Sequence, residues 1–335
     1  VACWGDNDYD QLGDGTTTDS STPVNVSLPS GRTATAISAG RWHTCAIMDN
    51  GSLMCWGKGN DGQIGDGAAT QRSTPSYVSL PSGRTAEAVT GGRWHTCAIL
   101  DDGSLWCWGH NNQGQLGDGT YTSRATPFNS VLPSGRTAVS IAAGYTHTCA
   151  ILDDGSVRCW GGNSYGQRGI GSSGGFSNTP ASSGSITLIP SGMSAVAIAI
   201  EDAHTCAILN DGSVWCWGYN MEGQIGNGYS GSSLWNALSP VQVNLPSGRT
   251  ADLLTAGRHH TCVVLAPNLA DSGPTMCWGK HNPNNSGMGG IGFTASNTPV
   301  YANITQNVVA LRGSNEHTCY VLSNNSVNCA GTSSQ

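Results

Sequence analysis

The sequence predicts an all-β chain that folds as one β-propeller domain over residues 1–335, with an internal disulfide in each blade. Three observations predict this fold. The tripeptide His-Thr-Cys occurs six times, a Cys-Trp-Gly tripeptide occurs six times before one Cys-Ala-Gly variant, and the copies of this second motif are spaced by 52, 52, 52, 57, 61 and 52 residues. A repeat of about this length is typical of one four-stranded propeller blade.

Within a repeat, four strands follow one another. Residues 33–40 form the first strand and residues 43–48 the second, and a turn at residues 49–51 leads into a third strand at residues 52–57. A glycine-rich loop then leads to the fourth strand, at residues 74–80. The Asp-Asn-Gly and Asp-Asp-Gly turns place glycine where a hairpin needs a positive φ angle. No segment has sustained helical periodicity, so we expect little or no helix.

The number of blades follows from counting these strands. Second strands with His-Thr-Cys and fourth strands marked by proline each occur six times, whereas third strands occur seven times. We predict six full repeats, in a ring that closes by pairing the C-terminal strands with the fourth strand near Pro23. A seven-bladed ring with one incomplete blade is the alternative. The predicted repeats cover residues 3–54, 55–106, 107–158, 159–215, 216–276 and 277–329.

The cysteines of one repeat are placed to form a disulfide. If the turn at residues 49–51 has three residues, Cys45 and Cys55 face each other across the hairpin, where opposed Cα atoms lie about 4.5 Å apart. The same offset recurs in four other repeats, and an insertion lengthens the hairpin loop in the remaining one. The predicted disulfides are Cys45–Cys55, Cys97–Cys107, Cys149–Cys159, Cys206–Cys216, Cys262–Cys277 and Cys319–Cys329.

The recurring histidines and tryptophans are interpreted as structural residues. Each histidine precedes its cysteine by two residues, so both share one face of a strand with a single partner cysteine. That arrangement offers three metal ligands at best and lacks the usual Cys-x-x-Cys pattern, so we predict buried histidines and no metal. The tryptophans that follow the third-strand cysteines point to the opposite face, and we expect them to pack between blades rather than to form a ligand cage: Trp56, Trp108, Trp160, Trp217 and Trp278.

Cys3 is left without a partner among the thirteen cysteines. One hypothesis is that the surplus strand at residues 1–5 adds to a neighbouring copy of the chain, with Cys3 in an intermolecular disulfide. Such head-to-tail contacts make rings or open filaments. The alternative is that Cys3 is unpaired because the preceding half of its hairpin is lacking. The chain begins within a repeat and without an initiator methionine, so we expect a processed or truncated product.

The segment HTCAILDDGSLWCWGHNNQGQLGDGT, residues 95–120, resembles the repeats of the regulator of chromosome condensation family. The elements G-x-x-H-T, D-G and W-G-x-N-x-x-G-Q-L-G carry the resemblance, which extends over essentially the whole chain. It implies a β-propeller, usually of seven blades, and the family includes secreted bacterial proteins that use the propeller as a protein-binding surface. It does not imply nuclear nucleotide exchange, because the matching positions are structural and the predicted disulfides contradict a nuclear location.

Composition limits the partners and the compartment. The net charge of −7 and pI near 5.6 argue against a nucleic-acid partner, which would require a basic stripe. No apolar run is long enough to span a membrane, so no membrane insertion is expected. Disulfides in every blade imply an oxidising compartment, and we predict an extracellular or cell-surface location.

Chemistry that breaks the repeat is sparse. The recurring aspartates of the Gly-Asp-Gly loops are interpreted as turn caps. Alternating acids at Asp6, Asp8 and Asp10 are a calcium candidate, although the complete twelve-residue loop with its terminal glutamate is absent. No catalytic triad or phosphate-binding loop stands out, so we predict no enzyme activity and no cofactor.

The inserted loops are the candidates for partner contacts, with exposed side chains expected at Phe176, Leu234 and Trp235. Two function classes follow. The first is a non-catalytic extracellular structural protein that self-associates, as a surface or filament subunit, through its surplus N-terminal strand. The second is a monomeric binding module, such as an adhesin or an inhibitor, that contacts another extracellular protein or glycans through these loops. Candidate N-glycosylation sites are Asn25, Asn50, Asn284, Asn303 and Asn324.

Overall fold

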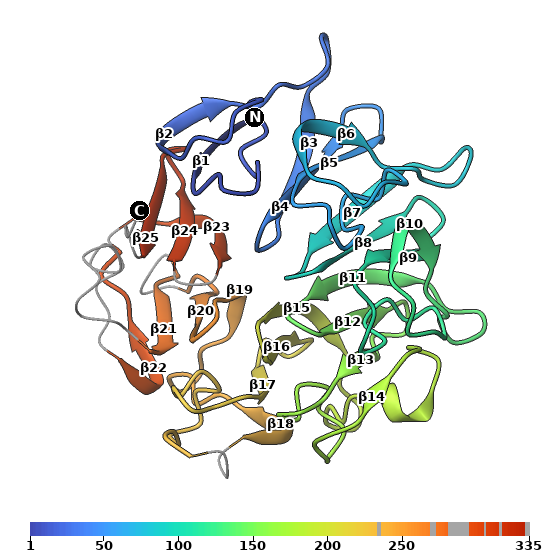
Figure 1. Cartoon of the computed structure of the whole chain (residues 1–335). Coiled ribbons are helices and arrows are strands. Elements are labelled where there is room, and N and C mark those ends of the chain that lie inside the picture. The colour runs from blue at the N-terminus through green and yellow to red at the C-terminus, as the bar shows by residue number, and fades with distance from the viewer. Residues whose placement is uncertain (233–235, 269–272, 281–294, 305, 315–316, 332–335) are drawn as a thin grey trace.

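The computed structural model describes residues 1–335 except 233–235, 269–272, 281–294, 305, 315–316 and 332–335. Figure 1 shows its antiparallel sheets arranged as blades around a central axis, with the first strand of each complete blade nearest the axis. Within the described ranges, the single helix is a short 3-10 turn at Ser183–Ser185, in agreement with the prediction of little helix. No helix in those ranges is long and apolar enough to cross a membrane.

Six blades each carry one disulfide, as predicted, and five of these blades have four strands in the described part of the chain. In chain order they contain β3 (Ala34–Ala39), β4 (His43–Met48), β5 (Leu53–Gly57) and β6 (Arg72–Tyr77); β7 (Ala86–Gly91), β8 (His95–Leu100), β9 (Leu105–Gly109) and β10 (Arg124–Asn129); β11 (Ala138–Ala143), β12 (His147–Leu152), β13 (Val157–Gly162) and β14 (Phe176–Ser177); β15 (Ala195–Glu201), β16 (His204–Leu209), β17 (Val214–Gly218) and β18 (Ala237–Gln242); and β19 (Ala251–Ala256), β20 (His260–Leu265), β21 (Thr275–Gly279) and β22 (Ser296–Tyr301).

The remaining strands form two smaller sheets. The sixth disulfide-bearing blade contains β23 (Val308–Gly313), β24 (His317–Leu322) and β25 (Val327–Gly331), and a separate sheet contains β1 (Ala2–Gly5) and β2 (Ser20–Asn25). Figure 1 shows the β1–β2 sheet in its own place in the ring, between β23–β25 and β3–β6.

The ring does not close in the way that strand counting suggested. The fourth strand near Pro23 is β2, and it pairs with β1, with Cys3 opposite Val24, rather than with the C-terminal strands. The reason is local: β1 and β2 are the third and fourth strands of one repeat, and they pair as β5 pairs with β6. The surplus strand is therefore paired within the chain along one of its edges.

The predicted hairpin register places each pair of cysteines face to face. Cys45 lies opposite Cys55, with their Cα atoms 4.1 Å apart, and the other five blades repeat this arrangement. Gly51 closes this hairpin with a φ of 76°, a conformation that costs little only for glycine. The third strand carries the second cysteine opposite the cysteine of the second strand in each of the six blades, so every disulfide joins the two middle strands of its hairpin.

Tryptophans join one blade to the next, as predicted. Trp108 is fully buried against Cys45 and Cys55 of the preceding blade, and its Nε1 donates a hydrogen bond of 2.9 Å to the backbone oxygen of Gln63. Trp160 lies in the same way with Cys97 and Cys107 of its preceding blade, whereas the sixth blade has Ala330 at this position, in one cluster with Cys262 and Cys277. The same hydrogen bond to a glutamine carbonyl is made by Trp56, Trp160, Trp217 and Trp278.

Candidate binding surface

Of the three residues predicted to contact partners from inserted loops, only Phe176 lies in the described part of the chain. Phe176 begins the two-residue strand β14 and is 54 % exposed, whereas Leu234 and Trp235 lie outside the described residues. Four of the five candidate glycosylation sites are exposed and the fifth, Asn284, lies outside the described residues; the exposed four are Asn25, Asn50, Asn303 and Asn324. Their occupancy stays a prediction.

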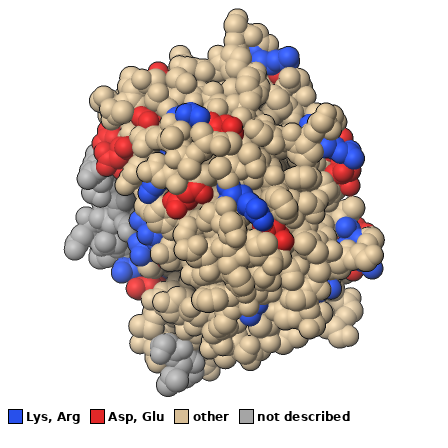
Figure 2. Space-filling model, turned by 45° about the vertical axis from the view of Figure 1, so that its right-hand side comes forward, with Lys and Arg blue, Asp and Glu red and all other residues tan. Residues whose placement is uncertain are grey.

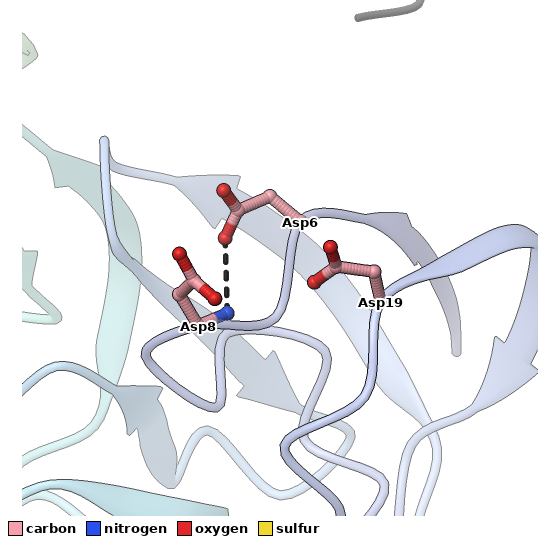
Figure 3. A group of neighbouring side chains, drawn as sticks. All are labelled: Asp6, Asp8 and Asp19. Atoms are coloured by element: carbon pink, nitrogen blue, oxygen red, sulfur yellow. Dashed lines mark hydrogen bonds between the residues drawn. The ribbon is translucent and has the colours of Figure 1, made fainter. Parts of the chain in front are cut away.

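The acidic group is composed differently from the prediction. Asp6, Asp8 and Asp19 bring one carboxylate oxygen each within 4.8 Å of one another (Figure 3). Asp10 does not join them, because it adopts a φ of 63°, is buried, and accepts a hydrogen bond of 2.7 Å from Gln71 in the neighbouring blade. The sequence spacing predicted Asp10 in place of Asp19, because Asp19, directly before β2, is far along the chain and comes close to Asp6 and Asp8 only when the loop folds back.

These acids already hold the loop together. Asp6 Oδ1 accepts the backbone N–H of Asp8 at 3.0 Å, the bond drawn in Figure 3, and Asp19 Oδ1 accepts the backbone N–H of Asn7 at 2.6 Å. The aspartates of the Gly-Asp-Gly loops act in the same way, as predicted: Asp118 accepts the backbone N–H of Thr120 at 2.9 Å. These hydrogen bonds fix the turns of both kinds of loop.

The histidines of the second strands form a chain of hydrogen bonds from blade to blade. Thr96 Oγ1 donates to the backbone oxygen of Gln63 at 2.8 Å, so it accepts from His43 Nε2, which identifies His43 as the neutral Nε2–H tautomer. Burial lowers the pKa of these five histidines from 6.5 to about 3 or 4. The bonds are His43–Thr96 at 2.8 Å, His95–Thr148 at 2.8 Å, His147–Thr205 at 2.9 Å, His204–Thr261 at 3.0 Å and His260–Thr318 at 2.6 Å.

A group of cations and aromatic rings lies where the first and second strands of two blades are connected. The sequence Gly-Arg-Trp-His-Thr occurs at residues 40–44 and 92–96, and the two turns are adjacent because the Arg41 N–H donates to the Gly92 oxygen at 3.3 Å. The rings of Trp42 and Trp94 stand 4.3 Å apart. We call the seven side chains gathered here the cation–aromatic cluster: Tyr9, Arg41, Trp42, Lys58, Arg93, Trp94 and Tyr145.

The cations of the cluster are stacked on rings and not on carboxylates. Lys58 Nζ lies 4.4 Å from the Trp94 ring centre and 4.8 Å from that of Trp42, and the Arg93 guanidinium lies 4.1 Å from the Tyr145 ring. In the described part of the chain, Arg41, Lys58 and Arg93 have no carboxylate oxygen within 4 Å. The side chains are half-buried, so the cluster combines excess positive charge with accessible aromatic surface.

The charges beside the cluster leave it positive. Asp202 is engaged by Arg258 at 3.1 Å. Burial, and then the charge of Asp202, raise the pKa of the neighbouring Glu201 to about 7 against the opposing effect of the nearby arginines, so Glu201 supplies less than a full negative charge at neutral pH. Burial, and then the neighbouring Arg93, lower the pKa of Arg41, which is the cost of holding unpaired cations together.

The rest of the surface has few charges. Figure 2 shows one face of the molecule, on which Lys, Arg, Asp and Glu side chains are scattered over a mostly uncharged surface. The cluster was not predicted from the sequence, because its residues come from several blades that are far apart along the chain. A signal was present: only two of the six His-Thr-Cys motifs follow Arg-Trp, and Lys58 is one of only two lysines.

Within the chain Cys3 forms no disulfide, and whether it bonds to another chain stays a prediction. It lies in the third-strand position and packs on the edge of the core that contains Trp56. Burial raises the pKa of the Cys3 thiol to about 11, so the thiol is protonated at neutral pH.

The repeated blades and the histidines buried between them define a repeat β-propeller. The family model described as the RCC1-like domain matches residues 1–263, and the chain belongs to this family. The resemblance seen in the repeats is thereby confirmed. RCC1-like propellers typically bind proteins and are generally non-catalytic.

Relatives of known identity support the assignment. The chain is 28 % identical over 295 residues to the ultraviolet-B receptor UVR8 of Arabidopsis thaliana, covering 86 % of this chain and 62 % of that one. It is 31 % identical over 230 residues to the human probable E3 ubiquitin-protein ligase HERC6, covering 68 % of this chain and 22 % of that one. The chain thus spans less than two thirds of the length of these relatives.

Solved structures share the fold. Yeast RCC1 (Prp20), solved with Kap60, matches with a TM-score of 0.80 at 19 % identity, covering 98 % of this chain and 78 % of that one. The CRINKLY WD40 ectodomain of the Arabidopsis thaliana receptor kinase ACR4 matches with a TM-score of 0.54 at 19 % identity, covering 90 % and 81 %. At these identities the similarity concerns the fold alone.

Proposed function

We propose that this chain is a non-catalytic extracellular propeller that binds other proteins, and that the cation–aromatic cluster receives an acidic segment of the partner. The observation that carries this proposal is the set of three cations, Arg41, Lys58 and Arg93, that stack on tryptophan and tyrosine rings without a carboxylate partner. Tryptophan, tyrosine and arginine are the residues that most often dominate protein interfaces.

The chemistry of the cluster favours carboxylates. A guanidinium offers a planar fork of donors that matches a carboxylate, and the unpaired positive charges lose their mutual repulsion when such a group binds. The net charge of −7 does not oppose this, because charges farther away than about 8–10 Å are screened at physiological ionic strength. Lys58 and the paired rings of Trp42 and Trp94 add apolar contact for the stem of the bound side chain.

The extracellular location is supported by the six disulfides, which persist in oxidising compartments. Several relatives, such as HERC6, carry names of ubiquitin ligases, so the family alone does not set the compartment. The ACR4 structure is that of a receptor-kinase ectodomain, so the same fold occurs in an extracellular setting.

The proposal is tested by titrating the purified protein with a synthetic hexaglutamate peptide at low salt and following tryptophan fluorescence. Saturable binding is expected, and its affinity should fall as the salt concentration is raised. Arg41→Ala and Arg93→Ala are each expected to weaken it about tenfold, which corresponds to about 1.4 kcal/mol. Hexalysine is the peptide control, and Arg136→Ala, which removes an exposed cation paired with Asp153, is the protein control.

Phe176→Ala separates this surface from the loop contacts predicted from the sequence. If hexaglutamate binding is unaffected by Arg41→Ala and Arg93→Ala, the cluster is not the site. If it is lost instead in Phe176→Ala, the inserted loop is the contact surface and the sequence-based prediction is preferred.

A second candidate function is the structural one, self-association of copies as surface or filament subunits. The observation that favours it is the edge of β1 that faces away from β2, which no strand covers in the described ranges, with the Cys3 thiol on the same strand. An unpaired edge is a template for strand addition. Light scattering and electron microscopy of the oxidised protein test it: regular polymers that disperse in Cys3→Ser support it, and a monomer in both cases refutes it.

A further inference from the structure

One loop of the third blade carries an arginine where other repeats carry an aliphatic core residue. Arg168 follows Gly166 and Gln167 in the loop between β13 and β14, and it is only 5 % exposed. A guanidinium is charged at every ordinary pH, so a permanent positive charge occupies a position that the fold uses for its core. The residues at the same position in four other repeats are at most 2 % exposed; they are Leu12, Ile64, Leu116 and Ile225.

The backbone fixes Arg168 beside the disulfide of its blade. Its N–H donates to the side-chain oxygen of Asn163 at 3.0 Å, and its carbonyl oxygen accepts from Thr187 Oγ1 at 2.9 Å. The same Thr187 hydroxyl lies 3.2 Å from the Sγ atom of Cys159. Arg168 therefore has the backbone setting of a core residue, and only its long side chain carries the charge towards the surface.

The guanidinium of Arg168 has no partner in the protein. Among the residues that the structure describes, no carboxylate oxygen lies within 4 Å of it and no aromatic ring stacks on it. Its Nε–H is buried without an acceptor. Its Nη groups are not buried, and the same residues offer them no acceptor either. The guanidinium is thus enclosed at Nε and open at its tip.

The surroundings of Arg168 supply no negative charge. Burial lowers the pKa of its guanidinium, against the opposing effect of Tyr121. Burial, with contributions from neighbouring histidines and from Arg168, also lowers the pKa of His147 to about 3, so this ring is neutral. The loops of two other repeats have an aspartate two residues further on, at Asp66 and Asp118, whereas this loop has Ile170 there. An unpaired buried cation is costly, and the described chain brings it no counter-ion.

We propose that the tip of Arg168 is a binding site for a tetrahedral oxyanion, sulfate or phosphate, taken as the free ion or as a group on a larger ligand. The planar fork of a guanidinium gives such an oxyanion two parallel hydrogen bonds. Tyr121, whose side chain is 49 % exposed, interacts electrostatically with Arg168 and so places a phenol hydroxyl near this tip. The small exposed fraction of Arg168 favours a compact anion over an extended acidic segment.

The test follows the Nε–H of Arg168 itself. In 15N-labelled protein its side-chain NMR signal is identified by its absence in Arg168→Leu, and sodium sulfate is titrated against sodium chloride at equal ionic strength. A saturable shift of this signal is expected in sulfate and not in chloride. The internal control is the Nε–H of Arg136, an exposed arginine paired with Asp153 and Asp154, whose signal is identified in Arg136→Ala and is expected to show no saturable shift.

A second ligand distinguishes the two sources of the anion. Glucose 6-sulfate carries the same group on a larger molecule. If it saturates the Arg168 signal at a lower concentration than free sulfate does, the site takes a ligand-borne group. If free sulfate saturates it at the same or a lower concentration, the site takes the free ion.

Two variants test the charge and the fork through thermal unfolding. Arg168→Leu restores the residue of Leu116, and in chloride it is expected to raise the unfolding midpoint by about 2–4 °C, because an unpaired buried ion is replaced by an apolar side chain. Low concentrations of sulfate are expected to raise the midpoint of the wild type by linkage and to have no such effect on Arg168→Leu. Arg168→Lys keeps the charge without the fork and is expected to bind sulfate about tenfold more weakly.

Two results would overturn the proposal. In the first, the Arg168 signal shifts equally in sulfate and in chloride. In the second, Arg168→Leu keeps the sulfate response of the wild-type midpoint. The site is separate from the cation–aromatic cluster, so Arg41→Ala is expected to keep the sulfate response and Arg168→Leu to bind hexaglutamate as the wild type does. The failure of one proposal therefore leaves the other standing.

Discussion

Acidification should destabilise this propeller long before its carboxylates protonate, because five histidines are buried as neutral rings. Their pKa values in the folded chain lie at about 3 to 4, below the ordinary value of 6.5. At pH 5.5 the unfolded chain therefore binds more protons than the folded chain. Stability is retained above pH 6.5 and is lost progressively as the pH falls from there towards the folded-state values.

The size of this loss in stability follows from the protonation of the histidines in the unfolded chain, because the buried rings stay neutral at pH 5.5. One pH unit below 6.5, protonation of one unfolded histidine lowers the free energy of unfolding by about 1.4 kcal/mol. The five buried histidines together give about 7 kcal/mol, a large part of the stability of an ordinary domain. The aspartate pKa values are lowered in the folded state, so their contribution is lost only at more acidic pH.

The assay is urea unfolding of the disulfide-intact protein at pH 7.5 and pH 5.5. His147→Gln removes one buried histidine and is expected to shrink the difference between the two pH values by about 1.4 kcal/mol, whatever it does to stability at pH 7.5. Val139→Ala, an exposed substitution on the neighbouring strand, is the control and should leave the difference unchanged. A wild-type difference below about 1 kcal/mol would show that the histidines are not buried as neutral rings.

Two further predictions concern packing between blades, both measured by urea unfolding at pH 7.5. Trp160→Ala should lower the free energy of unfolding by about 3–5 kcal/mol, because the ring is fully buried and its hydrogen bond to the preceding blade is lost. Trp4→Ala, which removes a 44 % exposed ring, should lower it by less than about 1 kcal/mol. Equal losses would mean that both rings pack alike. Gly117→Ala and Gly119→Ala both place a side chain at a positive φ angle, but only the first Cβ meets the Trp160 ring, at 2.6 Å. The loss in free energy of unfolding should therefore be about 1–3 kcal/mol larger for Gly117→Ala than for Gly119→Ala. A smaller loss for Gly117→Ala than for Gly119→Ala would contradict this reasoning.

The sequence predicted the features that depend on one repeat. The turn at Gly51 sets the register that places Cys45 opposite Cys55, and this information is local, so the hairpins and disulfides follow from spacing. The buried role of His43 was also predictable from its position beside the cysteine. Its hydrogen-bond partner Thr96 was not predicted, because predicting it requires the rotation between two neighbouring blades. The separation of 53 residues, one repeat period plus one residue, is the signal for this bond in the sequence.

Features that depend on how blades meet could not be predicted in the same way. Asp19 joins Asp6 only through the return of the loop to β2, and the contact of Lys58 with Trp94 joins two blades. The sequence showed only a strand count that did not balance, with seven third strands and six second strands. The structure shows that the extra third strand, β1, pairs with β2 in a sheet of its own, because the two are the third and fourth strands of one repeat.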